Sequence, residues 1–204
     1  MNNNLKKYKA QFENSKLLSK NKIINILFYL ESTDVDFTEQ PNKFGKSLLN
    51  GIDIVTEFCT FSIGNRFVNS HLGLSIDIGK TSDLETLYYD NEKKTPTSYL
   101  TCIIGNDIIS VDIYWLPSAF SNKVEYYPQE IEIKTNNHYL LISSIEVTNG
   151  NVESEFANEL LIIEDLNIAK ELGLGQFGER KNFKNLKELL QLEIKNDSRL
   201  SSKG

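Results

Sequence analysis

Histidine and carboxylate side chains perform most acid–base chemistry in proteins. The chain contains two histidines, His71 and His138, which are too few for a multi-histidine metal site. His71 has the same strand parity as Asp77, so a hydrolase that combines surface carboxylates with His71 is one possible function. Many other carboxylates are present, and no spacing singles one out as a catalytic partner. We therefore expect no catalytic residues and no metal site.

A glycine motif near the C-terminus has the spacing of a dinucleotide-binding fingerprint. Gly173, Gly175 and Gly178 fit this spacing, but the fingerprint requires a strand before the glycines and a helix that begins at them. Here Leu172 precedes them at the end of a helical pattern. The motif therefore predicts a helix cap and a glycine-rich turn, and we expect no cofactor.

Two segments combine tyrosines with acidic residues outside the alternating strand pattern. Tyrosine supplies a large contact area with little side-chain entropy to lose, so it is enriched in binding surfaces. We expect both segments to be loops that bind another protein, although tyrosines that cover a sheet edge give the same pattern. The candidate partner-binding residues are Asp83, Glu85, Tyr88, Tyr89, Asp90, Glu92, Tyr126 and Tyr127.

The composition is that of an ordinary globular protein. The 204 residues are 40% hydrophobic and 25% charged, with a formal net charge of -6. An acidic chain without a basic patch is a poor ligand for nucleic acid, and a basic protein is the easier partner. Cys59 and Cys102 have apolar neighbours, which favours buried thiols in a reducing compartment over a disulfide. With no signal peptide or bilayer span predicted, we expect a cytoplasmic protein that does not bind a membrane.

Periodicity predicts one α+β domain over residues 1–204, with a helical part at residues 1–32 and an antiparallel sheet at residues 52–148. Leu5, Tyr8 and Phe12 recur at helical spacing, which indicates an N-terminal amphipathic helix. The apolar run at residues 23–30 fits either a helix or a buried strand, and helix is favoured.

Three hairpins of about six strands are predicted within the sheet. Gly64 and Asn65 are expected to join strands 54–63 and 67–78, and Gly105 and Asn106 to join strands 99–104 and 107–115. The second hairpin would place Cys102 opposite Ile109 in the core.

The third hairpin is predicted around residues 136–137, between strands 130–135 and 138–147. Ile131 and Ile133 should point inward, whereas Glu130, Glu132 and Lys134 should point to solvent. A change of phase after Ile142 indicates a bulge at residues 143–144.

Helical periodicity returns at residues 153–195, followed by a frayed tail at 197–204. One helix should include residues 156–163, and another helix should end at Gly173. A last helix should bury one face, formed by Phe183, Leu186, Leu189, Leu190 and Ile194. Helices, then strands, then helices make an α+β chain, not a series of βαβ units.

The sequence features favour a cytoplasmic protein-interaction module. An acidic immunity-type inhibitor that binds a basic toxin is the specific form of this hypothesis. The acidic charge, the two tyrosine segments and the lack of a coherent catalytic constellation support this hypothesis. The hydrolase with His71 is one alternative. A structural subunit whose partner is another copy of the chain is the other.

Overall fold

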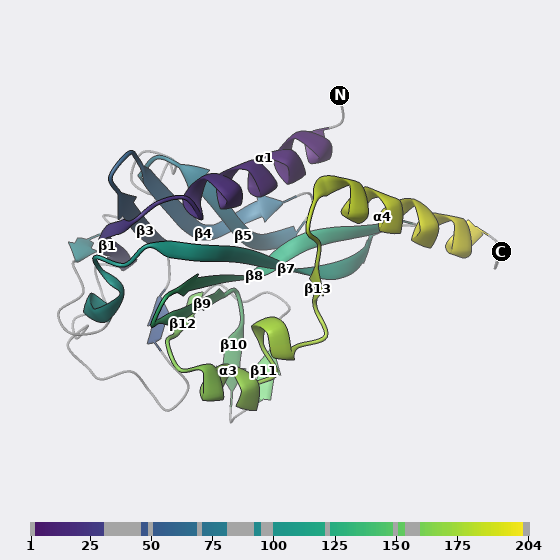
Figure 1. Ribbon diagram of the computed structural model, residues 1–204. Coiled ribbons are helices and arrows are strands. Elements are labelled where there is room, and N and C mark those ends of the chain that lie inside the picture. The colour runs from purple at the N-terminus through teal and green to yellow at the C-terminus, as the bar shows by residue number, and fades with distance from the viewer. Residues whose placement is uncertain are drawn as a thin grey trace.

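The computed structural model has the α+β fold that the sequence predicts, with N-terminal and C-terminal helices packed on antiparallel sheets (Figure 1). It describes residues 3–30, 46–48, 51–68, 71–80, 92–94, 100–120, 123–148, 151–153 and 160–201. Its strands form two large sheets where a single one was expected. Among the described helices, none combines the length and apolar character that a bilayer span requires.

The first large sheet has the order β5-β4-β3-β1-β6. Residues paired directly across antiparallel strands point to the same face. Ile26, Ile54 and Phe61 form one such row, and all three are buried. This row is part of the apolar surface that the sheet turns to the core. Its strands are β1 (Ile23–Leu30), β3 (Gly51–Thr56), β4 (Thr60–Val68), β5 (His71–Ile78) and β6 (Glu92–Lys94).

The second large sheet has the order β13-β7-β8-β9-β12-β2. A row formed by Ile113, Ile131, Ile142 and Ile162 crosses its inner face and joins the same core. Its strands are β2 (Lys46–Leu48), β7 (Ile108–Phe120), β8 (Lys123–Thr135), β9 (Tyr139–Ser143), β12 (Leu160–Ile163) and β13 (Lys181–Asn182). A separate pair consists of β10 (Glu146–Thr148) and β11 (Asn151–Glu153).

The helices lie around these sheets (Figure 1). The short helix α3 covers part of the outer face of the second sheet, where Ala169 packs against Leu141 and Ile163. The C-terminal helix α4 lies against β8 and buries Leu189. The helical segments are α1 (Asn3–Leu18), η1 (Thr101–Ile103), α3 (Leu166–Glu171), η2 (Gly175–Phe177) and α4 (Leu186–Ser201).

Helix α1 lies between the open edge of β5 and the strand β7. Gln11 accepts a hydrogen bond from the Ile76 N–H at 2.7 Å, and Asn14 donates one to the Ile76 carbonyl at 2.7 Å. These bonds satisfy backbone groups that an edge strand would otherwise expose. On another flank of α1, the rings of Tyr8 and Phe12 lie 5.5 and 5.6 Å from that of Trp115 on β7. One helix thus closes the seam between the two sheets.

The two sheets are in close contact at Gly73 on β5. A Cβ atom at this position would lie 2.6 Å from the Pro128 carbonyl oxygen and 3.0 Å from the Tyr127 ring. Because both neighbours belong to β8, a side chain at residue 73 would push the sheets apart. The glycine is therefore required by the packing of β5 on β8.

The segment at residues 23–30 is strand β1, so the favoured helix is wrong there. β1 pairs with β3 on one side and with β6 on the other. A central strand buried on both faces reads as a continuous apolar run, which explains the ambiguity. Residues 160–163 are likewise strand β12, with β9 and β2 on either side, and not part of a helix.

The first two predicted turns are also wrong. Gly64 lies inside β4, where it pairs with Gly51 and Ser75. The turn between β3 and β4 is built instead around Thr56, whose hydroxyl accepts the Cys59 N–H at 3.2 Å. A side-chain hydrogen bond therefore makes the turn that the glycine was expected to make.

The segment before β7 pairs with β1 and not with β7. Gly105, at φ 85°, ends the turn η1, and its N–H donates to the Ile23 carbonyl at 2.7 Å. Cys102 and Ile109 are both exposed, so the predicted buried pair is wrong. Ile109 lies at a register shift between β7 and β8, and this irregularity breaks the inside–outside alternation on which the prediction relied.

The third hairpin and the C-terminal helix stop are confirmed. Ile133 pairs with Leu140 across the turn at residues 136–137. The change of phase after Ile142 reflects the end of β9 at Ser143 and the start of β10 at Glu146. Gly173, at φ 64°, follows α3 as predicted. On α4, Ile194 is exposed instead of sharing the buried face.

We predict that Gly73→Ala lowers the free energy of unfolding by about 1–3 kcal/mol, because overpacking would separate β5 from β8. Urea denaturation measures the change. Gln191→Ala, at an exposed position of α4, is the control and should change it by less than about 0.5 kcal/mol. Equal stability of the two variants would contradict the close packing at Gly73.

Candidate functional site

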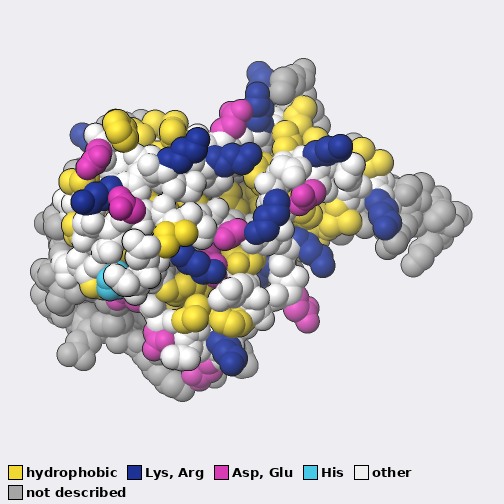
Figure 2. Space-filling view, viewed as in Figure 1, with side chains coloured by type: hydrophobic (Ala, Val, Ile, Leu, Met, Phe, Trp, Pro, Cys, Tyr) yellow, Lys and Arg dark blue, Asp and Glu magenta, His cyan; other side chains and the backbone are white. Residues whose placement is uncertain are grey.

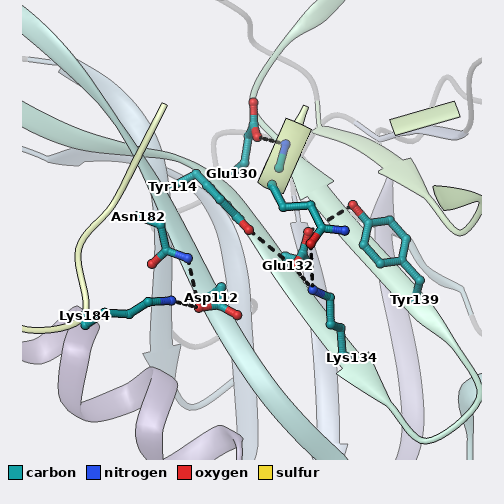
Figure 3. Close-up of polar contacts among 10 residues, drawn as sticks. Asp112, Tyr114, Glu130, Glu132, Lys134, Tyr139, Asn182 and Lys184 are labelled. Carbon is teal, nitrogen blue, oxygen red and sulfur yellow. Dashed lines mark hydrogen bonds and ion pairs between the residues drawn. The ribbon is translucent and has the colours of Figure 1, made fainter. Parts of the chain in front are cut away.

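Three carboxylates lie together on the outer face of the second sheet, and with their partners we call them the carboxylate cluster (Figure 3). Asp112 on β7 pairs with Glu132 on β8, and Glu130 is two residues from Glu132 on the same face. Tyr114 pairs with Glu130, and Tyr139 lies on the neighbouring strand β9. Cross-strand pairing and the alternation of side chains along each strand therefore place these residues on one face of the sheet.

Glu130 is fully buried and bound by two groups from the C-terminal segment. Arg180 Nε lies 2.6 Å from its Oε1, and the Gly175 N–H donates to its Oε2 at 2.5 Å. Burial raises the pKa of Glu130 to about 7, with a smaller rise from the charge of Glu132. Arg180 and the Gly175 N–H lower the pKa but do not offset the burial.

Glu132 is also fully buried and accepts from three side chains. Lys134 Nζ lies 2.6 Å from Oε1, the Tyr114 hydroxyl 3.3 Å from Oε1 and the Tyr139 hydroxyl 3.2 Å from Oε2. Burial, followed by the charge of Glu132, raises the pKa of both tyrosines well above the ordinary value. Both hydroxyls therefore stay protonated and act as donors.

Asp112 is partly exposed and is held by one residue of β13 and one residue just after it. Its Oδ1 accepts from Asn182 Nδ2 at 3.0 Å and from Lys184 Nζ at 2.9 Å. Burial raises the pKa of Asp112, but these hydrogen bonds and the charges of Lys184 and Lys134 outweigh it, and the net pKa is lowered. Asp112 is therefore ionised at neutral pH.

The cluster matches each carboxylate with a cation: Glu130 with Arg180, Glu132 with Lys134 and Asp112 with Lys184. A Cβ atom at Gly175 would lie 2.8 Å from Glu132 Oε2, so the chain covers the carboxylates closely. Within the described residues, no group of three or more histidine, cysteine, aspartate or glutamate side chains is placed to hold a metal ion. This geometry fastens residues 173–184 to the sheet.

The tyrosines of the second predicted segment lie in the core. Tyr126 and Tyr127 belong to β8 and are buried, so their expected place in an exposed loop is wrong. The Tyr126 ring packs edge-on against Phe183 at 5.1 Å, and Tyr127 contacts the Gly73 position. Proline and acidic residues are uncommon in strands, so Pro128 and its acidic neighbours prevented the prediction of this long strand.

The other sequence candidates fall at the margin of the described structure. Glu92 begins β6 opposite Leu30, and His71 begins β5 opposite Val68, but their side chains lie outside the described residues. The positions of Asp83, Glu85, Tyr88, Tyr89 and Asp90 also lie outside them. These predictions stay predictions.

Glu130 and Glu132 were expected in water and are instead buried. They do point away from the core, as their parity predicts, but residues 173–180 cover that face. The available signal was the combination of alternating glutamates on one strand with a glycine-rich segment followed by Arg180. Sequence spacing could not show that these two segments meet.

The exposed thiol of Cys102 lies 3.5 Å from Glu164 Oε1. Partial burial, followed by the charge and the hydrogen bond of Glu164, raises the pKa of this thiol. Burial also raises the pKa of Glu164. The pair disfavours the thiolate, which is the nucleophilic form of cysteine.

Five large apolar side chains are exposed on elements that converge at one end of the molecule, which we call the apolar end. Figure 2 shows hydrophobic atoms at the upper left, near the turn between β3 and β4. Phe58 in that turn is 82% exposed. The five residues are Leu17, Ile24, Phe58, Ile78 and Ile109.

Backbone contacts bring these elements together. Thr56 pairs with Ile23, which places the β3–β4 turn beside the start of β1. The Gly79 N–H donates to the Thr60 carbonyl at 2.9 Å, which brings the end of β5 to the same turn. A bridge between Lys22 and Asp107 joins the start of β7.

No protein-family model, curated protein or solved structure matches the chain.

We predict that Glu130→Gln removes a pH dependence of stability between pH 5 and pH 8. A carboxyl group whose folded pKa is raised from 4.5 to about 7 stabilises the fold most below pH 4.5 and loses this contribution as pH rises through 7. At pH 8 the variant should unfold with a free energy up to about 3 kcal/mol above that of the parent, and this difference should shrink as the pH falls and vanish below pH 4.5.

Urea denaturation at several pH values measures this difference. Glu179→Gln, at an exposed position of the same segment, is the control and should leave the pH profile unchanged. A loss of stability in Glu130→Gln that is equal at pH 5 and pH 8 would contradict the raised pKa.

We also predict that Glu164→Gln makes Cys102 alkylate faster with iodoacetamide at pH 8. Removing the neighbouring charge lowers the pKa of the thiol and increases the thiolate fraction. Mass spectrometry in a Cys59→Ala background follows the single remaining thiol, with Glu179→Gln as the control. Identical rates in the two variants would show that Glu164 does not act on Cys102.

Proposed function

We propose that the chain is a protein-interaction module that binds a partner protein through the apolar end. The observation that carries this proposal is the exposure of five large apolar side chains, among them Phe58, on converging elements. Scattered exposed apolar residues are normal, whereas several on neighbouring elements are more typical of interaction sites. An aromatic side chain such as Phe58 is suited to anchor an interface by filling a pocket of the partner.

The net charge of -6 favours a basic partner, because opposite net charges speed association. An immunity-type inhibitor of a basic toxin is the specific form of the proposal. Close to the apolar end, Lys22 forms a backbone bridge with Asp107, and Glu57 directly precedes Phe58, so charge there is mixed. We therefore expect apolar burial to supply the affinity and the overall charge to steer the approach.

The hydrolase alternative was expected at His71, whose side chain lies outside the described residues. At another place, the pKa of about 7 at Glu130 suits acid–base chemistry. Glu130 and Glu132 are nevertheless buried and already bound to Arg180 and Lys134. A substrate would have to displace residues 173–180 to reach them. Binding through exposed side chains requires no such rearrangement.

The test is photo-crosslinking in the native cell with p-benzoyl-phenylalanine in place of Phe58. We expect one specific protein to be crosslinked, and its affinity for the purified chain to fall roughly tenfold or more in Phe58→Ser. The same photo-reactive residue at Gln191, on α4, is the matched control.

Equal crosslinking from residue 58 and residue 191 would contradict the proposed face. Light scattering of the purified chain distinguishes the remaining alternative. A crosslink to the chain itself, together with a dimer in solution, would favour the homo-oligomeric subunit over a binder of another protein.

A further inference from the structure

A pocket of about 160 Å³ lies beside β7, between α1 and the residues that follow β13. Residues 111–113 of β7 form one wall, Phe12 and Lys16 of α1 a second, and Phe183 and Lys184 a third. Residues 111 and 113 face the core and Asp112 the opposite side of the sheet. A pocket lined by both sets lies at the edge of the strand.

This edge of β7 has no strand beside it at the pocket. β13 pairs only with Trp115 and Tyr114, and the Ile108 N–H bonds to the Asn21 carbonyl further along. In the described part of the chain, no strand pairs with the edge between these points. Backbone groups of successive residues alternate between the two edges of a strand, so at least one of residues 111–113 offers its N–H and C=O to the pocket.

Helix α1 makes different contacts with the edges of β5 and β7. Gln11 and Asn14 satisfy the backbone of Ile76 on β5. Facing β7, α1 presents Phe12, Ser15 and Lys16, and the Ser15 hydroxyl donates to the Phe12 carbonyl of its own helix. The edge of β7 is therefore left available for an external strand.

The side chains of the pocket define what such a strand would carry. Lys16 and Lys184 place two cations at the pocket against the single charge of Asp112, which favours a ligand with a negative group. Lys184 Nζ lies 2.9 Å from Asp112 Oδ1. Phe12 and Phe183 offer apolar surface for one side chain of the ligand.

We propose that this pocket binds the carboxyl-terminal end of an extended peptide by strand addition to β7. The peptide backbone pairs with residues 111–113, its terminal carboxylate lies between Lys16 and Lys184, and its last side chain contacts Phe12 and Phe183. Strand addition and capture of a terminal carboxylate are both established ways of peptide recognition. A cavity of about 150 Å³ holds a ring the size of benzene, so the volume suits one terminal side chain.

The site is separate from the apolar end and depends on different observations. A partner could use either surface without the other, so failure of the pocket experiment leaves the crosslink from residue 58 unaffected.

The experiment uses the full chain, labelled with ¹⁵N, and pools of acetylated hexapeptides randomised at the last three positions. One pool has free carboxyl ends and the other has amidated ends. We expect the free-acid pool to shift the amide resonances of residues 111–113 and Lys16. Amidation should weaken binding roughly tenfold, because it removes the charge that the two lysines contact.

Lys16→Gln is the test variant, because Lys16 is exposed and its replacement should leave the fold intact. It should weaken binding of the free-acid pool several-fold and leave the amidated pool unchanged, whereas Lys187→Gln on α4 should change neither. Equal shifts from both pools, shifts outside the pocket, or no shifts at all would each overturn the proposal. Free leucine binding as well as the free-acid peptides would also overturn it, because backbone pairing would then contribute nothing.

Discussion

The hydrogen bonds between α1 and the backbone of Ile76 are the constraint on which the arrangement of the two sheets depends. Gln11 and Asn14 satisfy the last strand of one sheet, while Tyr8 and Phe12 on another flank pack on Trp115 of the other. Since these contacts come from a single helix, neither sheet can shift without breaking a polar or an apolar contact. The close approach at Gly73 fixes the same seam from the side of β8.

The C-terminal segment depends on a different kind of contact. Buried carboxylates on β8 hold residues 173–184 through Arg180 and the Gly175 N–H, and β13 then adds two residues to β7. Removing charges from water has a large free-energy cost, and at Glu130 the ion pair and the hydrogen bond offset only part of it. Because β13 ends at Asn182, the same segment that covers the carboxylates also leaves the neighbouring edge of β7 open.

Local patterns predicted the elements better than their contacts. The N-terminal helix, the hairpin at residues 136–137 and the stop at Gly173 follow from neighbours within a few positions, and all three are confirmed. Residues 23–30 could not be assigned from periodicity because a central strand and a buried helix are both apolar throughout. The cluster of Glu130 with Arg180 joins residues 50 positions apart, and the pairing of Gly105 with Ile23 spans 82. Neither contact has a local signal.

Helix α1 closes the edge of β5 and leaves that of β7 open. Amide hydrogen exchange measured by NMR tests it residue by residue. We expect slow exchange at Ile76, faster exchange there in Gln11→Ala, and rapid exchange at one or more of residues 111–113 in the parent. Exchange at all three of these residues as slow as at Ile76 would contradict it, because every backbone group of that edge would then already have a partner.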